Sequence, residues 1–439
     1  MQKIDNGFQV NEGISPLKLI EKYDAPLYVY DAAIIERQFH QLNNAFSVPK
    51  LTLNYACKAL TNISIIKFLR QLGAGLDCVS IQEIKIGLTA GFQPKEIIYT
   101  PSGVSFDEID AAIELGVRIN IDNLPLLEYI GRLEQKVPVC IRINPHIMAG
   151  GNEKISVGHV GSKFGISFHQ IPHIKELVQA YNIQIDGLHM HTGSDILDVD
   201  VFLQGAEILF DMAKDFPNLD FIDLGSGFKV PYYEGAKATN IKELGIKLSE
   251  RFNRFCQQYG KELTLIFEPG KFLVSAAGYF LVKVNVVKQT TAKVFIGVDS
   301  GLNHLIRPMF YDAYHHIENL SNPDGKERLY DVVGYICETD TFAENRLIPE
   351  VREGDILAFY NAGAYCFTMA SNYNSRLRPA EVMLYKGVDY LIRERETFED
   401  LLKHQIEVDV RQEEAPLQLA TLDSIEIENT ADTQKGAMK

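Results

Sequence analysis

The sequence predicts an α/β protein built from a (β/α)8 barrel and a second, all-β C-terminal domain. Across residues 50–270, short β-rich runs alternate with amphipathic helical stretches, and there are eight such runs. Eight strands that alternate with helices can close into a parallel barrel. After about residue 275, β-rich runs follow one another without long helical stretches between them, which predicts the second domain.

Each predicted barrel strand is a short run rich in apolar and β-branched residues, bounded by turn residues. The eight runs are residues 51–56, 75–79, 97–100, 118–121, 139–144, 185–191, 221–225 and 263–269. Helical stretches such as 81–91 and 106–116 lie between them and end at glycine, which is common at helix C-termini.

The predicted β domain begins with a hairpin formed by residues 279–289 and 292–301. The runs at 355–365 and 380–387 continue in the same style, and the N-terminal segment is a candidate for a further strand. We therefore expect the barrel at residues 35–275 and the β domain at 1–34 together with 276–405. We expect the polar tail at 406–439 to be partly disordered, and the glycine-rich stretch 148–163 to form a mobile loop.

Composition and charge exclude several classes of function. The net charge of −15 argues against nucleic acid or an anionic membrane as a partner, because phosphates would be repelled. No apolar run approaches the ~20 residues of a transmembrane helix, and the N-terminus lacks the apolar core of a secretory signal. The six cysteines form no CxxC pair, so we expect reduced thiols, no metal site and a cytoplasmic protein.

Polar residues recur where the predicted strands end. Lys58 follows the first strand, Asp77 lies in the second, Arg142 and Asn144 end the fifth, and two histidines end the sixth. A single lysine near a strand end is usually solvated, and a single histidine on an apolar strand usually belongs to the core. The carboxyl ends of all eight strands meet at one rim, however, and this rim carries the active site in such barrels. Their joint placement therefore favours an active site.

The residue types at this rim suit one cofactor chemistry. Partial desolvation lowers the pKa of a lysine such as Lys58, and the free amine then forms an imine with an aldehyde. His189 and His191 point to the same face of their strand, where an imidazole can stack on a flat ring. The N–H groups of residues 225–227 suit a phosphate, and Glu268 suits a protonated pyridine nitrogen. Together these groups predict a site for pyridoxal 5′-phosphate.

Ten sequence pieces then carry a resemblance to a known family. They include "PLYVYD" (26–31), "YACKA" (55–59), "HMHTGSD" (189–195), "DLGSGF" (223–228), "EPGK" (268–271), "CETDTF" (337–342) and "GAYCFTMASNYNSRLRPAEV" (363–382). The ten pieces are spread over residues 25–385. The sequence resembles the group IV, alanine-racemase-like decarboxylases that use pyridoxal 5′-phosphate, and within them the diaminopimelate decarboxylases.

The resemblance implies three sets of site residues. The catalytic residues are Lys58, His191 and Cys337. The cofactor is bound by Lys58, Asp77, His191, Ser194, Gly225, Ser226, Gly227, Glu268, Gly270, Lys271 and Tyr365. The substrate is bound by Lys271, Arg307, Tyr311, Glu338 and Tyr365.

The resemblance also implies a reaction and an assembly. The reaction is the decarboxylation of meso-2,6-diaminopimelate to L-lysine and CO2, with Lys58 as the covalent anchor of the cofactor. Cys337 is the implied proton donor, and Glu338 contacts the far amino group of the substrate. In the family, this Cys-Glu element reaches the active site from the other subunit of a homodimer.

Two positions depart from the family pattern. Ser226 takes the middle place of a turn that is usually Gly-Gly-Gly; serine keeps the N–H, so we expect phosphate binding to survive where its backbone angles are allowed. Lys271 replaces an arginine, which exchanges a bidentate fork for a point charge. Lys271 keeps the positive charge, but it changes the geometry with which a substrate carboxylate is bound.

Alternative functions remain open at this stage. Ornithine-, arginine- and carboxynorspermidine-type decarboxylases share the scaffold, but ornithine-type enzymes resemble a Cys-Asp pair where this chain has Cys337 and Glu338. Racemases on the same barrel lack that element and the long run at 363–382. Catalytically silent proteins that bind pyridoxal phosphate resemble the barrel alone, without a β domain.

Overall fold

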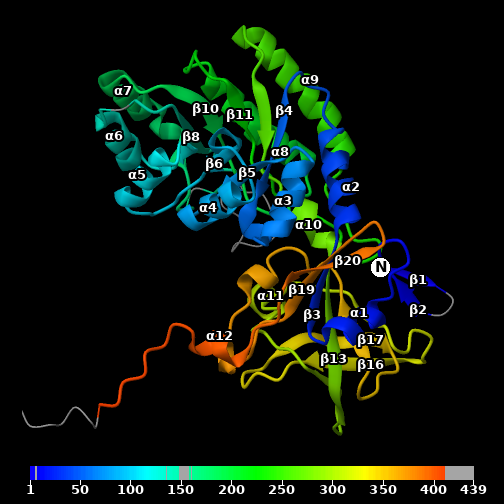
Figure 1. The fold of residues 1–439 in the computed structure, drawn as a ribbon. Coiled ribbons are helices and arrows are strands. Elements are labelled where there is room, and N and C mark those ends of the chain that lie inside the picture. The colour runs from blue at the N-terminus through cyan, green and yellow to red at the C-terminus, as the bar shows by residue number, and fades with distance from the viewer. Residues whose placement is uncertain (5–6, 135, 148–157, 160, 411–439) are drawn as a thin grey trace, which may run out of the picture. The chain divides into compact units, whose positions relative to one another are not determined.

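The structure, a computed structural model, describes residues 1–410 apart from 5–6, 135, 148–157 and 160 (Figure 1). Most of the predicted loop at 148–163 and most of the predicted tail therefore lie outside the described residues. The chain divides into two units, residues 1–397 and 398–439. The first unit contains both sheets, and the second contains the short helix α12 (Phe398–Leu402).

Eight parallel strands close into a barrel in the first unit. β12 pairs with β4 and β10 pairs with β8, so the ring has no free edge between them. This arrangement confirms the predicted (β/α)8 barrel. The strands are β4 (Leu51–Ala56), β5 (Gly75–Cys78), β6 (Ile97–Tyr99), β7 (Arg118–Ile121), β8 (Val139–Asn144), β10 (Ile185–His189), β11 (Phe221–Asp223) and β12 (Thr264–Phe267). A two-residue strand, β9 (Ile166–Ser167), adds to β8.

Helices connect the barrel strands and begin at polar capping residues. The side chain of Ser80 accepts from the Glu83 N–H at the start of α4, and Ser105 accepts from the Glu108 N–H at the start of α5. Satisfying an N–H that has no partner within the helix stabilises the first turn. The helices are α2 (Ala32–Asn43), α3 (Ile63–Gln71), α4 (Ile81–Thr89), α5 (Phe106–Glu114), α6 (Leu124–Arg132), α7 (Ile171–Tyr181), α8 (Val199–Ala213) and α9 (Ile241–Tyr259).

Alternation along the barrel strands decides which side chains enter the barrel. In β11, Ile222 packs in the large core that the helices share, whereas its neighbour Phe221 packs with Ile98, Cys140 and Ile266 in a separate small cluster. Side chains two residues apart share a face of a strand, so Asp223 faces the interior with Phe221. By the same rule Asp77, Arg142 and His189 face the interior from their own strands, above the apolar cluster.

The second sheet is mixed and has nine strands. The hairpin of β13 (Gly278–Gln289) and β14 (Val294–Val298) is antiparallel as predicted. The N-terminal strand β3 (Leu27–Asp31) lies between β13 and β19, so the N-terminal segment adds a strand to this sheet. The other strands are β15 (Ile317–Asn319), β16 (Glu327–Val333), β17 (Thr341–Pro349), β18 (Ile356–Phe359), β19 (Ala380–Tyr385) and β20 (Val388–Arg393).

Short elements complete the first unit. They are the pair β1 (Gln2–Ile4) and β2 (Gly7–Gln9) and the helices α1 (Pro16–Tyr23), α10 (Lys271–Val274) and α11 (Arg307–Tyr311). The barrel strands lie within residues 35–275 and the strands of the mixed sheet lie outside them, so we keep the predicted domain division as a proposal. None of the described helices has the length and apolar character needed to span a membrane.

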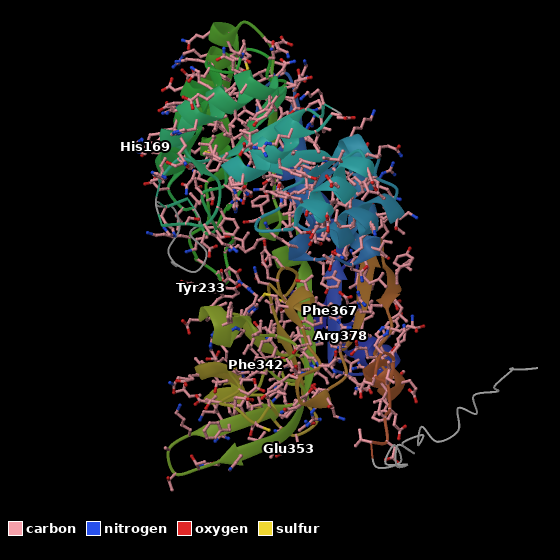
Figure 2. The ribbon with its side chains drawn as sticks, turned by 90° about the vertical axis from the view of Figure 1, so that its left-hand side faces the viewer. His169, Tyr233, Phe342, Glu353, Phe367 and Arg378 are labelled. Atoms are coloured by element: carbon pink, nitrogen blue, oxygen red, sulfur yellow. The ribbon has the colours of Figure 1, made fainter. Side chains whose placement is uncertain are left out.

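Barrel and mixed sheet meet at the carboxyl rim of the barrel. The ring of Tyr233, from the loop after β11, lies 5.2 Å from the ring of Tyr314, which follows α11. Figure 2 shows Tyr233 at this level, with Phe342 and Glu353 farther into the mixed sheet. The Tyr365 N–H also donates to the Ala59 carbonyl, 2.8 Å away, next to Lys58. Residues of the second sheet therefore border the open end of the barrel.

Candidate active site

The structure brings most of the predicted site residues together around one cavity of about 1360 Å³ at the carboxyl rim. Ligand pockets usually measure about 300–1,000 Å³, so this cavity has room for a cofactor together with a substrate. The predicted residues that line it, or the small recess continuous with it, are Lys58, Asp77, His191, Ser194, Ser226, Gly227, Glu268, Gly270, Lys271, Arg307, Tyr311 and Tyr365.

Lys58 lies in a short 3-10 turn, η1 (Cys57–Ala59), directly after β4. Its side chain lines the cavity and is accessible to solvent there. Burial acts to lower the pKa of the amine, but Asp77, Tyr365 and Glu268 outweigh burial, and the pKa is raised. The expectation of a lowered pKa is therefore wrong, because it considered desolvation without the acidic groups that face the amine.

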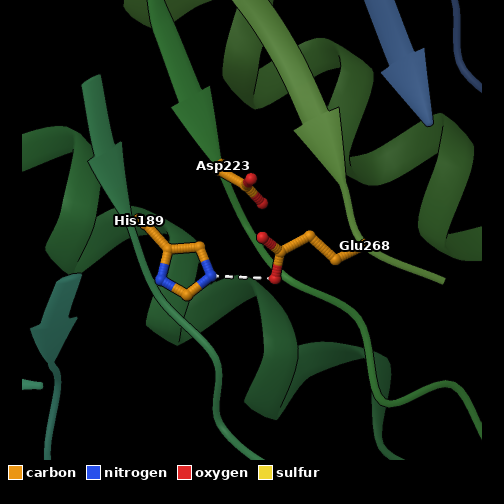
Figure 3. A group of neighbouring side chains, drawn as sticks. All are labelled: His189, Asp223 and Glu268. Atoms are coloured by element: carbon orange, nitrogen blue, oxygen red, sulfur yellow. Dashed lines mark hydrogen bonds and ion pairs between the residues drawn. The ribbon is translucent and has the colours of Figure 1, made fainter. Parts of the chain in front are cut away.

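Glu268 follows β12, and its Oε2 lies 2.9 Å from His189 Nε2 (Figure 3). Burial acts to raise the pKa of this carboxyl, but His189, His191 and Lys58 outweigh burial and lower it to about 2. Burial also lowers the pKa of both histidines, that of His191 by a large amount. At neutral pH the site therefore holds an ionised Glu268 beside two neutral imidazoles.

Asp77 faces the amine of Lys58 from the neighbouring strand β5. Burial, followed by the charge of Glu268, raises the pKa of Asp77 to about 7, while Lys58 and the hydroxyl of Thr100 act to lower it. The hydroxyl of Thr100 donates to Asp77 Oδ1 at 2.9 Å. Asp77 is thus a group whose charge changes near neutral pH at the floor of the cavity.

The turn after β11 approaches the loop after β10 closely. Gly225 and Gly227 have φ of 61° and 104°, and a Cβ on Gly227 would lie 1.9 Å from the Gly193 carbonyl oxygen. Only glycine fits such a position. Ser226 between them is not among the described residues with positive φ, so its side chain causes no backbone strain. The Gly225 N–H donates to Asp223 Oδ1 at 2.8 Å, and Gly225 does not line the cavity.

Lys271 forms a nearly buried ion pair. Its Nζ lies 2.5 Å from Oδ1 of Asp195, in the loop after β10. Asp195 has a φ of 61°, a left-handed conformation that aspartate tolerates better than most residues. Both side chains line the large cavity, so the positive charge of Lys271 is partly neutralised there.

Arg307 lines the cavity from helix α11, which lies between strands β14 and β15 of the mixed sheet in the chain. Its Nη2 donates to the hydroxyl of Tyr232 at 3.0 Å, and its Nη1 lies 3.3 Å from His315 Nε2. The Nδ1 of His315 in turn lies 2.8 Å from the Tyr360 carbonyl oxygen and can donate to it. The guanidinium is therefore held at two points, and Tyr311 lines the same part of the cavity.

Cys337 and Glu338 do not join the cavity. Both side chains are exposed in the loop between β16 and β17. Asn374 Nδ2 lies 3.3 Å from the Cys337 sulfur, and the hydroxyl of Tyr373 donates to Glu338. Within one chain, these two predicted residues therefore belong to an exposed surface of the mixed sheet.

The arrangement fits pyridoxal 5′-phosphate in its donor groups. Lys58 offers an accessible amine, and Glu268 offers an ionised carboxylate whose buried Oε1 has no hydrogen-bond partner within the described part of the chain. The neutral ring of His191 lines the same recess, as do Ser194, Ser226 and Gly227. An amine, a carboxylate, a flat neutral ring and a narrow turn are the parts that such a cofactor requires.

Comparisons with known proteins show the family to which the chain belongs. Residues 32–275 match the family model described as pyridoxal-dependent decarboxylase, pyridoxal binding domain. The chain is 38% identical to a diaminopimelate decarboxylase of Methanothermobacter thermautotrophicus over 412 residues, which cover 91% of this chain and 96% of the relative. The chain belongs to the diaminopimelate decarboxylase family. It is a pyridoxal phosphate-dependent decarboxylase of meso-diaminopimelate, and L-lysine is the product.

Solved structures of diaminopimelate decarboxylases share the fold. One from M. jannaschii has a TM-score of 0.86 and 30% identity, and covers 93% of this chain and 98% of its own. One from Helicobacter pylori, complexed with L-lysine, has a TM-score of 0.82 and 32% identity, and covers 88% of this chain and 98% of its own. Similarity over nearly whole chains includes both the barrel and the mixed sheet.

Sequence reasoning gave no role to two residues that the structure places at the site, Asp223 and Tyr232. Asp223 faces the barrel interior beside Glu268, and strict alternation along its strand would have located it. His189 was expected on the same face as His191, and it meets Glu268 there. Tyr232 supports Arg307 from a loop, where no periodicity indicates which side chains meet.

Proposed function

We propose that meso-2,6-diaminopimelate is decarboxylated in the cavity at the carboxyl rim, with Lys58 as the covalent anchor of the cofactor. The convergence of Lys58, His191 and Glu268 on one recess, with Arg307 on the wall of the adjoining cavity, is the observation that supports this most. When bound, pyridoxal phosphate supplies an electron sink for the electron pair that the departing carboxylate leaves behind.

The residues of the recess hold and orient the cofactor in this proposal. Glu268 accepts a hydrogen bond from the ring nitrogen and, because it is ionised, keeps that nitrogen protonated. The neutral imidazole of His191 covers one face of the ring. Ser194, Ser226, Gly227 and Gly270 surround the phosphate, and Asp77 and Tyr365 border the amine of Lys58.

Arg307 and Tyr311 bind the distal carboxylate of the substrate, and Lys271 adds positive charge nearby. The guanidinium is buried and held by Tyr232 and His315, so it is already positioned before the substrate arrives. A charge-assisted bond from a fixed guanidinium selects a substrate with a second carboxylate. Ornithine and arginine have no such group, which favours diaminopimelate over these substrates.

A substrate panel tests this assignment. Purified protein loaded with pyridoxal phosphate is given meso-diaminopimelate, ornithine, arginine or carboxynorspermidine, and CO2 and the amine product are measured. We expect lysine from meso-diaminopimelate and slow or no turnover of the others. Strong turnover of ornithine with none of meso-diaminopimelate would overturn the proposal, and loss of optical rotation without CO2 would indicate a racemase.

We further propose a homodimer in which Cys337 and Glu338 complete the cavity of a second subunit. The exposure of both side chains supports this, since neither of them lines the cavity of its own chain. In the dimer, the Cys337 thiol returns a proton to the α-carbon after CO2 leaves, and Glu338 accepts hydrogen bonds from the distal amine.

Subunit complementation tests the shared site. Lys58→Ala and Cys337→Ala homodimers should both be inactive, but a mixture should regain activity because each heterodimer keeps one complete site. Random pairing makes half the dimers mixed, so recovery should approach about one quarter of the wild-type activity. No recovery from exchanged subunits would show that each chain uses its own Cys337.

We propose that the enzyme acts in the cytoplasm. All six cysteines are free, and five of them are buried, which fits a reducing compartment. Localisation of a tagged chain by cell fractionation checks this, and recovery outside the cytoplasmic fraction would contradict it.

A further inference from the structure

Three ionisable side chains meet inside the barrel, and two of them, His189 and Glu268, line the cavity. His189, Asp223 and Glu268 are all buried, and their ligand atoms lie within 4.8 Å of one another (Figure 3). His189 Nε2 meets Glu268 Oε2, and Asp223 Oδ1 accepts from the Gly225 N–H. The second oxygen of each carboxylate, Asp223 Oδ2 and Glu268 Oε1, is buried and has no hydrogen-bond partner among the described residues.

Placing two ionised carboxylates this close together inside the barrel is unfavourable in free energy. A carboxylate oxygen only accepts hydrogen bonds, so two neighbouring oxygens without donors leave both charges unsatisfied and mutually repelling. Buried polar atoms are nearly always paired, and a single proton between the two groups would pair both of them. The geometry therefore calls for one proton on this carboxyl pair.

The surroundings decide which carboxyl carries the proton. Glu268 has His189 at one oxygen and Lys58 nearby, and its pKa is lowered to about 2. Of the residues that the structure describes, only Gly225 donates a hydrogen bond to Asp223, through its N–H, and burial followed by the charge of Glu268 raises the pKa of Asp223 well above the usual range. Asp77 on β5 adds further negative charge, whereas Arg142 on β8 opposes it. The proton therefore belongs to Asp223.

We propose that Asp223 is a positioning residue that stays protonated and donates its hydroxyl hydrogen to Glu268 Oε1. This inference rests on the proposed function in one respect, since it gives Glu268 the task of binding the cofactor's ring nitrogen. Asp223 itself does not line the cavity, and its carboxylate lies within 4.8 Å of the Glu268 carboxylate. It acts through the glutamate and is not a catalytic residue.

The hydrogen bond has two consequences for the site. Glu268 receives one donor at each oxygen, Asp223 at Oε1 and His189 Nε2 at Oε2, which fixes the plane of its carboxylate. Two donors also stabilise the ionised form of Glu268 inside the barrel. The same pattern fixes the tautomer of His189, whose hydrogen must then lie on Nε2.

Substitution of Asp223 by asparagine is the matched test. The amide oxygen keeps the bond from Gly225, and its NH2 group replaces the hydroxyl as a donor toward Glu268. We expect the infrared spectrum of the cofactor-free wild-type protein at neutral pH to contain a carbonyl band of one protonated carboxyl that Asp223→Asn lacks. A difference spectrum without this band would overturn the proposal.

Glu268→Gln provides a second measurement should Asp223→Asn fail to fold. The carbonyl band of Asp223 should remain in this variant but shift, because its hydroxyl loses a charged acceptor. An unshifted spectrum would contradict the hydrogen bond between the two side chains. Both measurements use cofactor-free protein, so they stand even where Lys58 fails to bind pyridoxal phosphate and the proposed function fails.

The activity of the enzyme loaded with pyridoxal phosphate shows whether Asp223 positions Glu268 by a hydrogen bond or only fills space beside it. Asp223→Ala removes the donor, and its kcat should fall at least about tenfold below that of Asp223→Asn, the size of a lost hydrogen bond to a charged group. The KM for meso-diaminopimelate should change little, since Asp223 does not reach the substrate. Equal kcat values for the two variants would show that the hydrogen bond has no part in positioning Glu268.

Discussion

Lys58 illustrates how neighbouring charges set the behaviour of a single residue. Its amine lies at a barrel mouth where desolvation alone would favour the neutral form, yet Asp77, Tyr365 and Glu268 raise its pKa. Coulomb attraction in a weakly screened interior outweighs the cost of burying one charge beside several opposite ones. The amine is thus held as a cation between acidic groups until an aldehyde reacts with it.

Arg307 is the residue for which we predict the clearest effect on substrate binding. Arg307→Gln should raise the KM for meso-diaminopimelate by about 10–100-fold, because a charge-assisted hydrogen bond contributes about 1.5–3 kcal/mol. Absorbance of the bound cofactor should stay unchanged, since Arg307 does not border Lys58. Steady-state kinetics together with an absorbance scan measure both.

A matched control for this variant is Arg254→Gln. Arg254 is an exposed arginine on α9 that pairs with Glu250 on the same helix. Exposed ion pairs contribute little, so its kinetics should equal those of the wild type. A similar KM increase in both variants would mean that the loss of Arg307 acts through general charge and not through the substrate's carboxylate.

At the scale of elements, the sequence predicted the strands better than the contacts between them. β4, β7 and β8 begin and end as expected, because apolar runs bounded by turns locate a strand directly. Several other runs extended past the strand into the rim, as at 185–191. The pairing of Asp195 with Lys271 and of His189 with Glu268 could not be predicted, because it depends on how separate loops and strands approach in space.

The turn after β11 gives a prediction about one structural element. Gly227→Ala should destabilise the fold by about 1–3 kcal/mol and abolish cofactor absorbance, because φ is 104° and its Cβ would meet the Gly193 carbonyl. Ser226→Gly should cost less than about 1 kcal/mol and retain absorbance, since Ser226 needs no special backbone angle. Denaturant unfolding and cofactor titration compare the two. Loss of absorbance in Ser226→Gly alone would contradict the assignment of the turn.

The whole molecule should lose stability in acid through buried histidines. Burial lowers the pKa of His304 to about 4, from an ordinary value of 6.5. Below pH 6.5 His304 therefore binds a proton in the unfolded chain but stays neutral in the folded protein. The contribution of His304 to the free energy of unfolding is present in full above pH 6.5 and is lost as the pH falls toward 4. From about pH 7 to about pH 5 the loss from this one group is about 2 kcal/mol.

Urea unfolding at both pH values measures this contribution. His304→Gln cannot titrate, so its free energy of unfolding should fall by about 2 kcal/mol less than that of the wild type. The exposed His173 offers the control, and His173→Gln should follow the wild type. Equal acid losses in all three proteins would show that His304 does not remain neutral in the folded state.

The proposed homodimer would make the complete enzyme larger than one chain, and one sequence cannot locate a site that two subunits share. Sequence motifs identified Cys337 and Glu338, yet the structure leaves both on an exposed loop. The sequence pattern of one chain does not indicate which of its surfaces a second copy covers. The barrel and its rim follow from periodicity, whereas a site completed between subunits depends on assembly.

The most direct test of the central claim is the identity of the residue that binds the cofactor. Protein loaded with pyridoxal phosphate is reduced with borohydride, digested and examined by mass spectrometry. We expect the added mass to lie on the peptide containing Lys58 and to be absent from Lys58→Ala, which should also show no absorbance from covalently bound cofactor. Modification of another lysine, or an unchanged spectrum in Lys58→Ala, would contradict it.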